Sequence, residues 1–237
     1  MKKMIKIIFV LCFSVVLLSY GFMIGQYHYF PYNQIREVKR NLTGNSETST
    51  YSNYYYNKES FYSAYNNGKP DLVFLGDSLT DIAEWQEMFP NLLVVNRGIN
   101  GDTTIGVIDR LSSITSMQPT KIFIMLGVND IMTGKTVEDT YNNYIEIIKT
   151  LKSKGFDIYV QSTLLADHFK ADNSKIIELN SKLVNFCKEN NITYIDLNSG
   201  LTINEKLRGD LTIDGIHLNN KGYDIWKSEI NKILNNK

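Results

Sequence analysis

The chain has 237 residues, and its 25 Lys and Arg balance its 25 Asp and Glu, so the formal net charge is zero. This balance excludes a general electrostatic affinity for nucleic acid or for an acidic membrane surface, and partners must be argued from individual sites. The two cysteines and three histidines offer neither a disulfide framework nor a metal cluster. We therefore expect a globular protein that uses no metal and no other cofactor.

Residues 1–25 predict a membrane segment. After Lys2, Lys3 and Lys6 the segment carries no charge, and roughly 20 mostly apolar residues suffice to cross a hydrocarbon core of about 30 Å. Because lysines precede the span, we expect a single-pass helix with an inside amino terminus and a translocated domain, although basic residues within 36–40 reduce this contrast. The alternative is a cleaved signal and a secreted protein.

Residues 26–50 are polar and show no clear period, which predicts a flexible tether. We expect residues 51–237 to form the folded domain, beginning with a helix that packs on it and ends near Gly68. The candidates for the buried face of this helix are Tyr55, Phe61, Tyr62 and Tyr65. A carbohydrate-binding aromatic strip is the other interpretation of this spacing.

From residue 71 onward, short apolar runs alternate with helical stretches. The predicted strands are 72–75, 92–95, 121–126, 157–161 and 192–195. The predicted helices are 81–88, 103–112, 136–153, 173–190 and 220–234. Strands that alternate with helices imply right-handed crossovers and a parallel sheet. The predicted fold class is therefore α/β, a three-layer α/β/α sandwich with a five-stranded parallel sheet.

Small and amide residues follow the first three predicted strands. The first strand runs into Gly76-Asp77-Ser78, where a sharp turn would present the Ser78 hydroxyl at the carboxyl edge of the sheet like a nucleophile. For this tripeptide taken alone, a Ser that caps the next helix is the commoner case. Gly101 and Asn129 follow the second and third strands and could donate hydrogen bonds to a developing oxyanion, although each is also a typical turn residue.

A possible base lies just before the last predicted helix. Asp214 and His217 are three residues apart, so the carboxylate could hold one ring nitrogen of the imidazole while Ser78 faces the other. His168, after the fourth strand, is a weaker rival because no equally well spaced carboxylate accompanies it. The Asp-x-x-His pair could also be a loop hydrogen bond or half of a metal site, but no further Cys, His or Glu cluster accompanies it.

The chain resembles the SGNH branch of the GDSL esterase/lipase family over roughly residues 70–237. The resemblance lies in four blocks in the family's order, LGDSLTD, NRGINGDTT, LGVNDI and DGIHLNNKGY. It implies a flavodoxin-like hydrolase fold with Ser78 as nucleophile, His217 as general base and Asp214 as the carboxylate that orients the base. It also implies an oxyanion hole made by the backbone N–H groups of Ser78 and Gly101 and by the Asn129 side chain.

Within that family the chain is similar to the branch of platelet-activating-factor acetylhydrolase and lysophospholipase-like esterases, which remove short acyl groups from lipids or sugars. The sequence thus predicts a membrane-tethered bacterial serine esterase with an extracytoplasmic domain. Its expected substrate is a short acyl, possibly acetyl, ester on a cell-envelope glycan or lipid. The alternatives are an acyltransferase that uses the same three residues and a non-catalytic surface-binding module.

Overall fold

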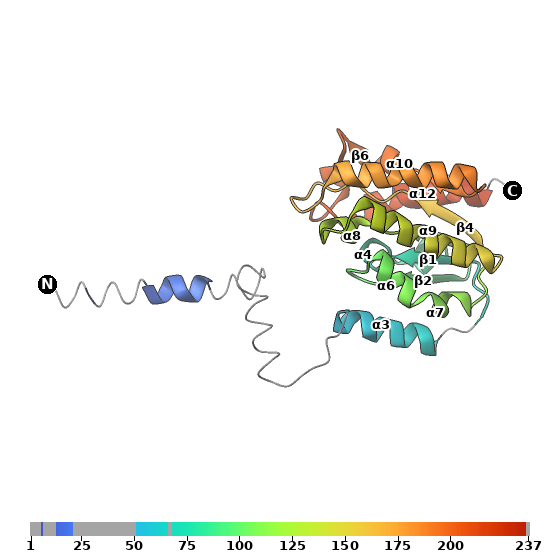
Figure 1. Cartoon of the computed structure of the whole chain (residues 1–237), viewed down its shortest axis with the longest axis horizontal. Coiled ribbons are helices and arrows are strands. Elements are labelled where there is room, and N and C mark those ends of the chain that lie inside the picture. Colours follow the sequence, from blue (N-terminus) through green and yellow to red (C-terminus); the bar gives the residue numbers. More distant parts are fainter. Residues whose placement is uncertain (1–5, 7–12, 21–50, 66–67, 236–237) are drawn as a thin grey trace. The chain divides into compact units, whose positions relative to one another are not determined.

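The computed structural model describes residues 6, 13–20, 51–65 and 68–235 (Figure 1). Contacts divide the chain into two units, residues 1–50 and 51–237. The predicted tether and most of the predicted membrane segment lie outside the described residues. Residues 13–20 are helical, and no helix among the described residues has the length and apolar character needed to span a bilayer.

Five parallel strands form the centre of the second unit (Figure 1). They are β1 (Leu72–Gly76), β2 (Val94–Gly98), β3 (Lys121–Met125), β4 (Asp157–Gln161) and β5 (Thr193–Ile195). Their order is β2-β1-β3-β4-β5, and the register aligns Gly76 with both Gly98 and Met125. The chain leaves β1 on one side for β2 and returns past it to β3. The carboxyl ends of β1 and β3 therefore flank a topological switch point, where open α/β sheets bind ligands.

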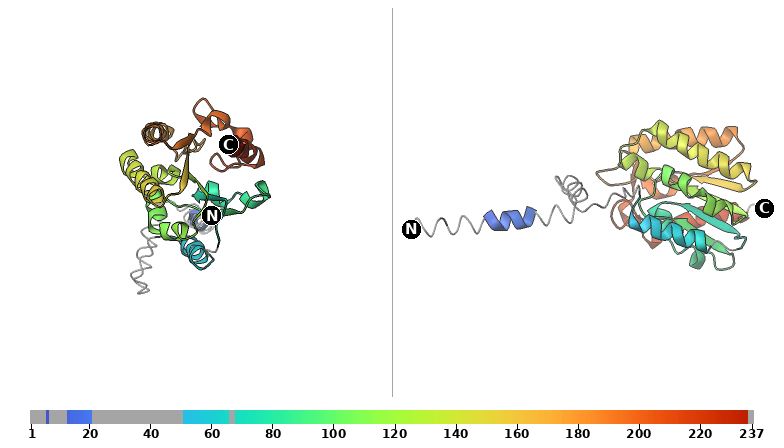
Figure 2. Two further views of the ribbon diagram at one scale, coloured as in Figure 1. Left: turned by 90° about the vertical axis from the view of Figure 1, so that its right-hand side faces the viewer. Right: turned by 60° about the horizontal axis from the view of Figure 1, so that its bottom comes forward.

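Helices cover both faces of this sheet (Figure 2). They are α4 (Ser78–Asp81), α5 (Trp85–Met88), α6 (Thr104–Asp109), α7 (Leu111–Thr115), α8 (Val128–Met132), α9 (Val137–Ser153), α10 (Asn173–Glu189), α11 (Asn198–Leu201) and α12 (Asn220–Asn235). Val73 and Leu75 of β1 join the core under α6 to α10, whereas Phe74 joins the opposite core and stacks on Trp85 with 3.7 Å between ring centroids. This alternation along one strand confirms the predicted three layers.

Three predicted elements have different boundaries in the structure. The predicted strand 92–95 begins at Val94 and continues to Gly98, because Asn96 and Arg97 pair with β1. The Asn96 amide also donates to the carbonyls of Thr80, Asp81 and Ala83. The predicted helix 103–112 is broken into α6 and α7 at Arg110, whose backbone is not helical (φ −112°, ψ 11°). The predicted helix 81–88 is likewise two short helices, α4 and α5.

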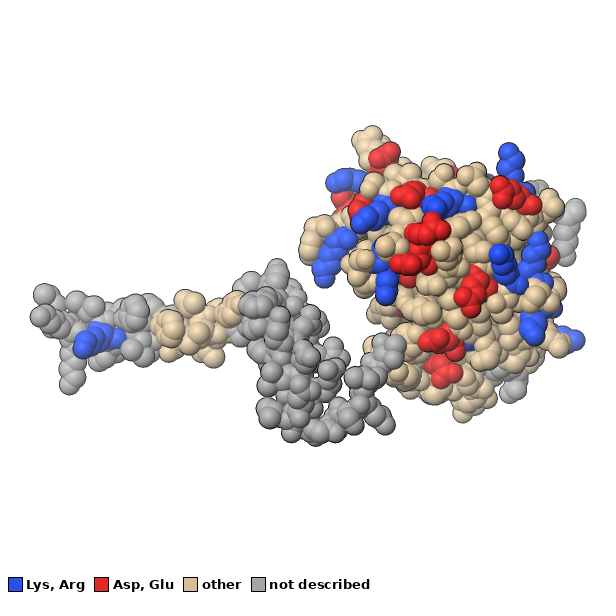
Figure 3. Space-filling model, viewed as in Figure 1, with Lys and Arg blue, Asp and Glu red and all other residues tan. Residues whose placement is uncertain are grey.

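Several short elements were not predicted, since strands of two residues and single helical turns show no period in the sequence. They are α8, α11, the 3-10 turn η1 (Gly209–Leu211) and an antiparallel hairpin of β6 (Thr202–Ile203) and β7 (Lys206–Leu207). Acidic and basic side chains are interspersed over the face of the domain shown in Figure 3, as expected for a chain without net charge.

The predicted aromatic helix is α3 (Asn53–Ala64), which packs on the domain beside α7 (Figure 1). Tyr55 and Tyr62, seven residues apart on one face, are buried. The prediction was wrong for Phe61 and Tyr65, which are 54% and 71% exposed. Phe61 points about 100° away from the buried face, and Tyr65 lies beyond the last helical residue.

Candidate active site

Ser78 is the first residue of α4, directly after β1 and the connecting residue Asp77. The Asp77 carboxylate accepts a hydrogen bond from the Leu79 N–H at 3.1 Å and so caps the short helix. The end of β2 packs closely below: a Cβ at Gly98 would lie 2.2 Å from the backbone nitrogen of Asp81. Only glycine fits there, so the sequence fixes the close contact that holds Ser78 at the edge of the sheet.

His217 brings the predicted base to Ser78. Its Nε2 lies 2.9 Å from Ser78 Oγ, and its Nδ1 lies 2.7 Å from Asp214 Oδ2. The other oxygen of Asp214 accepts hydrogen bonds from the backbone N–H groups of Ile216 and His217 at 2.9 and 2.7 Å. Burial raises the pKa of Asp214, but the hydrogen bonds from His217 and Ile216 outweigh it and hold this pKa below its usual value.

These contacts form one continuous chain from a hydroxyl through an imidazole to an ionised carboxylate. In such a chain the imidazole can take the hydroxyl proton, and the carboxylate can stabilise the imidazolium that results. The predicted rival, His168, instead accepts a hydrogen bond from the Lys170 N–H at 3.2 Å. Within the described residues, no group of three or more His, Cys, Asp or Glu side chains is placed to hold a metal ion.

The loop after β2 carries the predicted oxyanion donor Gly101. Residues Ile99 to Asp102 form a turn closed by a hydrogen bond from the Asp102 N–H to the Ile99 carbonyl at 3.0 Å. Gly101 has φ +76°, which favours glycine at this position of the turn. No hydrogen bond within the described part of the chain uses the backbone N–H of Ser78 or Gly101. Both donors are therefore available at the switch-point edge.

Asn129 lies in the single helical turn α8 that follows β3. Its Nδ2 donates to the backbone carbonyl of Asp102 at 2.9 Å, which places the amide against the loop of Gly101. One N–H of the amide is thereby fixed, and the second remains available to another acceptor. The structure thus brings Asn129 to Asp102, in the loop that carries Gly101, and His217 to Ser78.

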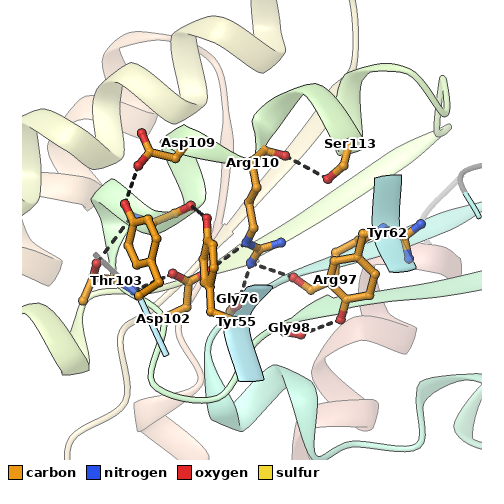
Figure 4. A network of polar contacts seen from close by, with 12 residues as sticks. Tyr55, Tyr62, Gly76, Arg97, Gly98, Asp102, Thr103, Asp109, Arg110 and Ser113 are labelled. Carbon is orange, nitrogen blue, oxygen red and sulfur yellow. Dashed lines mark hydrogen bonds and ion pairs between the residues drawn. The ribbon is translucent and has the colours of Figure 1, made fainter. Parts of the chain in front are cut away.

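A buried ion pair that the sequence did not indicate lies beneath this loop. The Arg110 guanidinium donates to the Asp102 carboxylate at 2.8 Å, and both side chains are completely buried. The same guanidinium donates to the carbonyls of Gly76 at 3.2 Å and Arg97 at 3.0 Å, so it ties the end of β1 to the loop (Figure 4). Arg110 lies eight residues beyond Asp102, and nothing in that spacing indicates an ion pair.

Two further carboxylates are buried near the site. Asp130 accepts hydrogen bonds from both the N–H and the hydroxyl of Thr104, which link α8 to the start of α6. Asp77 is fully buried, and one of its oxygens has no hydrogen-bond partner within the described residues. Burial, helped by the negative charges of Asp102 and Asp130, raises the pKa of Asp77 to about 7. In the sequence, the only indication of a role for Asp77 or Asp130 is that each lies within one of the four family blocks.

The family model of the GDSL-like lipase/acylhydrolase family matches residues 74–225, which is more than half of the chain. The match includes all five predicted site residues. The chain belongs to the GDSL-like lipase/acylhydrolase family. This result confirms the resemblance that the four sequence blocks predicted.

The curated relatives of this chain carry the names of two different enzymes. The N-acylneuraminate cytidylyltransferase of Streptococcus agalactiae is 28% identical over 170 residues, which are 71% of this chain and 40% of that protein. The platelet-activating factor acetylhydrolase IB subunit alpha2 of Rattus norvegicus is 26% identical over 164 residues, which are 65% of this chain and 72% of that protein. The chain therefore spans about 40% of the length of the first of these relatives.

Solved structures of GDSL family proteins share the fold. A Bacteroides fragilis protein provisionally classed as an acylhydrolase has a TM-score of 0.68 at 26% identity and covers 74% of this chain and 95% of its own. The acetyl xylan esterase AlAXEase has a TM-score of 0.57 at 22% identity, with 69% of this chain and 98% of its own covered. At 22% identity, the similarity to AlAXEase shows only that the two proteins share a fold.

Proposed function

We propose that this chain is a serine esterase that hydrolyses a short acyl ester through an acyl-serine intermediate. The proposal rests on one observation above all: Ser78 Oγ, the His217 ring and the Asp214 carboxylate form an unbroken hydrogen-bonded chain with separations of 2.9 and 2.7 Å. A serine hydroxyl is a weak nucleophile until an adjacent base takes its proton, and this geometry supplies that base.

In the first half of the reaction, Ser78 Oγ attacks the carbonyl carbon of the ester while His217 Nε2 takes the hydroxyl proton. The negative charge that develops on the carbonyl oxygen is stabilised by the N–H groups of Ser78 and Gly101 and by the Asn129 amide. Asp214 stabilises the imidazolium. When the tetrahedral intermediate collapses, the alcohol oxygen leaves with the proton from His217, and the acyl group stays on Ser78.

In the second half, water replaces the alcohol. His217 takes a proton from the water as its oxygen attacks the acyl carbon, and the same three donors hold the oxyanion. Collapse of this intermediate breaks the bond to Ser78 Oγ, which receives the proton back from His217. The products are the free acid and the resting enzyme, and no redox step or co-reactant other than water is needed.

We propose a short acyl group, such as acetyl, on a cell-envelope glycan or lipid as the substrate. The rat relative is named an acetylhydrolase of platelet-activating factor, and a structural neighbour is named an acetyl xylan esterase. These names support hydrolysis of an acetyl ester that is attached to either a lipid or a glycan. Fold does not fix the substrate, so the choice between them belongs to experiment.

A series of p-nitrophenyl esters of increasing acyl length, with acetylated glycans and lysophospholipids beside it, tests this proposal. We expect the highest kcat/KM for the shortest acyl groups. A preference for long chains would contradict the short-acyl assignment. Transfer of the acyl group to an added sugar acceptor in place of water would identify an acyltransferase. A folded protein without turnover or covalent labelling by an organophosphonate would instead be a binding module.

We also propose that the chain is anchored in the cell membrane by residues 1–25, with the catalytic domain outside the cytoplasm. The support is the uncharged apolar run that follows three lysines. In intact cells, added protease should cut the domain while a tag placed before Lys2 stays protected. Sensitivity of the domain only after lysis would reverse the orientation. Mature protein in the medium that begins near Phe22 would show a cleaved signal.

A further inference from the structure

Helix α3 fastens the loop of Gly101 from outside the part of the chain that matches the family, residues 74–225. Three side chains spaced four residues apart on α3 contact this region, and we call them the α3 clasp. They are Tyr54, Lys58 and Tyr62. A spacing of four residues puts them on one face of the helix. The residues from Gly98 to Asp102 are called the oxyanion loop below.

The first two clasp residues act through Asp81. Tyr54 donates its hydroxyl to Asp81 Oδ2 at 2.6 Å, and Lys58 pairs with Asp81 Oδ1 at 2.6 Å. Asp81 is the last residue of α4, the helix that begins with Ser78, and its side chain is only 6% exposed. The same Oδ2 accepts a hydrogen bond from the Asn100 N–H at 3.1 Å. The clasp therefore orients a carboxylate that holds the oxyanion loop directly beside Gly101.

The third clasp residue, Tyr62, acts on the start of the loop. Its buried hydroxyl donates to the Gly98 carbonyl at 2.6 Å. Its ring lies over the Arg97 guanidinium, 4.4 Å from the ring centroid, with the Arg110 guanidinium at 5.9 Å (Figure 4). Since Arg110 holds Asp102, the loop is fastened at its first residue by Tyr62 and at its last by Arg110.

The loop needs this external support at its exposed residues, Asn100 and Gly101, whereas Gly98, Ile99 and Asp102 are buried. A Cβ placed on Gly101 would meet no atom within 4 Å. An oxyanion donor contributes fully only if its position is fixed before the reaction. A displacement of about 1 Å in such a group can cost roughly 10²-fold in rate.

We infer that the α3 clasp is a positioning device for the oxyanion loop, and that Tyr54, Lys58 and Tyr62 are positioning residues for the Gly101 N–H. For its kinetic consequence this inference rests on the proposed esterase function. A donor that acts in the transition state affects kcat, whereas binding of the ground-state ester depends little on it. Loss of the clasp should therefore lower kcat and leave KM nearly unchanged.

Three tyrosines of α3 and Tyr65, the residue directly after it, provide a matched test. The clasp variant is Tyr54→Phe/Tyr62→Phe, which removes two hydroxyls that bond to the domain. The control is Tyr56→Phe/Tyr65→Phe, which makes the same chemical change at residues 42% and 71% exposed, whose hydroxyls form no hydrogen bond within the described residues. We expect the clasp variant to lose about tenfold or more in kcat with KM within about twofold. The control should keep both constants within about twofold of the wild type.

A second control separates positioning from general stability. Ile230→Val removes one methyl group from the fully buried core under α12, on the other face of the sheet, and lowers stability without contact to the clasp. It should leave kcat unchanged well below its melting temperature. The inference is overturned if the folded clasp variant keeps kcat within about twofold of the wild type, or if Ile230→Val lowers kcat equally.

A measurement without substrate tests the clasp independently of the proposed function. Backbone amide hydrogen exchange in residues 98–102 should be about tenfold faster in the clasp variant than in the wild type and the tyrosine control. Unchanged exchange in this loop would overturn the inference even for an active esterase. If exchange rises while the wild-type protein hydrolyses no ester, the clasp stands as a loop-ordering device and the proposed function fails.

Discussion

The two halves of the candidate site are held in place in different ways. Asp214 and His217 bond to each other within one short loop, and their side chains are 47% and 22% exposed. The oxyanion loop instead depends on the completely buried pair of Asp102 and Arg110, and on contacts from α3, α4 and α8. A base can be oriented by a few local hydrogen bonds, whereas backbone donors must be fixed from several elements at once.

The largest effect should come from removing the Ser78 hydroxyl, which His217 contacts in the first half of the site. Ser78→Ala removes the nucleophile, and we expect ester hydrolysis to fall by at least about 10⁴-fold. Covalent labelling by an organophosphonate should disappear, while the circular dichroism spectrum stays that of the wild type. Labelling that persists in the folded Ser78→Ala protein would exclude Ser78 as the nucleophile.

The second half can be weakened at Asn129. Asn129→Ala removes one predicted donor and the hydrogen bond to the Asp102 carbonyl. We expect kcat to fall by roughly 10²–10³ and KM to change far less, because the donor acts mainly in the transition state. Steady-state kinetics on a short p-nitrophenyl ester measure both constants. If kcat stays within about threefold of the wild type, Asn129 is only a turn residue.

A smaller effect concerns Asp77, the buried carboxyl next to Ser78. Because burial raises its pKa to about 7, the folded protein binds more protons than the unfolded chain between the unfolded value near ~4 and pH ~7. The free energy of unfolding should therefore fall as the pH rises through this window, by up to about 1.4 kcal/mol per pH unit. Asp77→Asn keeps the helix cap and removes this titration.

Urea unfolding of both proteins at pH 5 and pH 8 checks this prediction. Asp102, whose pKa burial raises to about 6, adds a change of the same sign in both proteins. The informative quantity is therefore the difference between the two proteins. From pH 5 to pH 8, the Asp77→Asn protein should lose less free energy of unfolding than the wild type. An identical pH dependence in the two proteins would show that Asp77 does not titrate in this range.

The smallest expected effect is that of chelation. Both halves of the proposed site use hydrogen bonds from residues of the chain, so activity should survive prolonged treatment with EDTA. The assay compares initial rates before and after dialysis against the chelator. Loss of activity that returns on adding zinc would instead indicate that Asp214 and His217 act as metal ligands.

The sequence by itself determined the framework and the chemical groups. Alternation of apolar runs with helical stretches predicted the parallel sheet, since a strand buried on both faces must be apolar throughout. Ser78, Gly101 and Asn129 are predicted from the sequence because each follows a strand, and the carboxyl ends of parallel strands meet at one edge. Asp214 and His217 are predicted because their spacing allows a local contact.

Only the tertiary structure decided how the oxyanion loop is held. The contacts of Tyr62 with Gly98 and of Arg110 with Gly76 join residues 36 and 34 positions apart, and such separations leave no period in the sequence. The structure also decided which aromatic residues of α3 are buried, because that depends on where the helix ends and on what lies beneath it. Buried polar groups must find partners wherever the fold brings them together, so their pairing follows from packing and not from spacing along the chain.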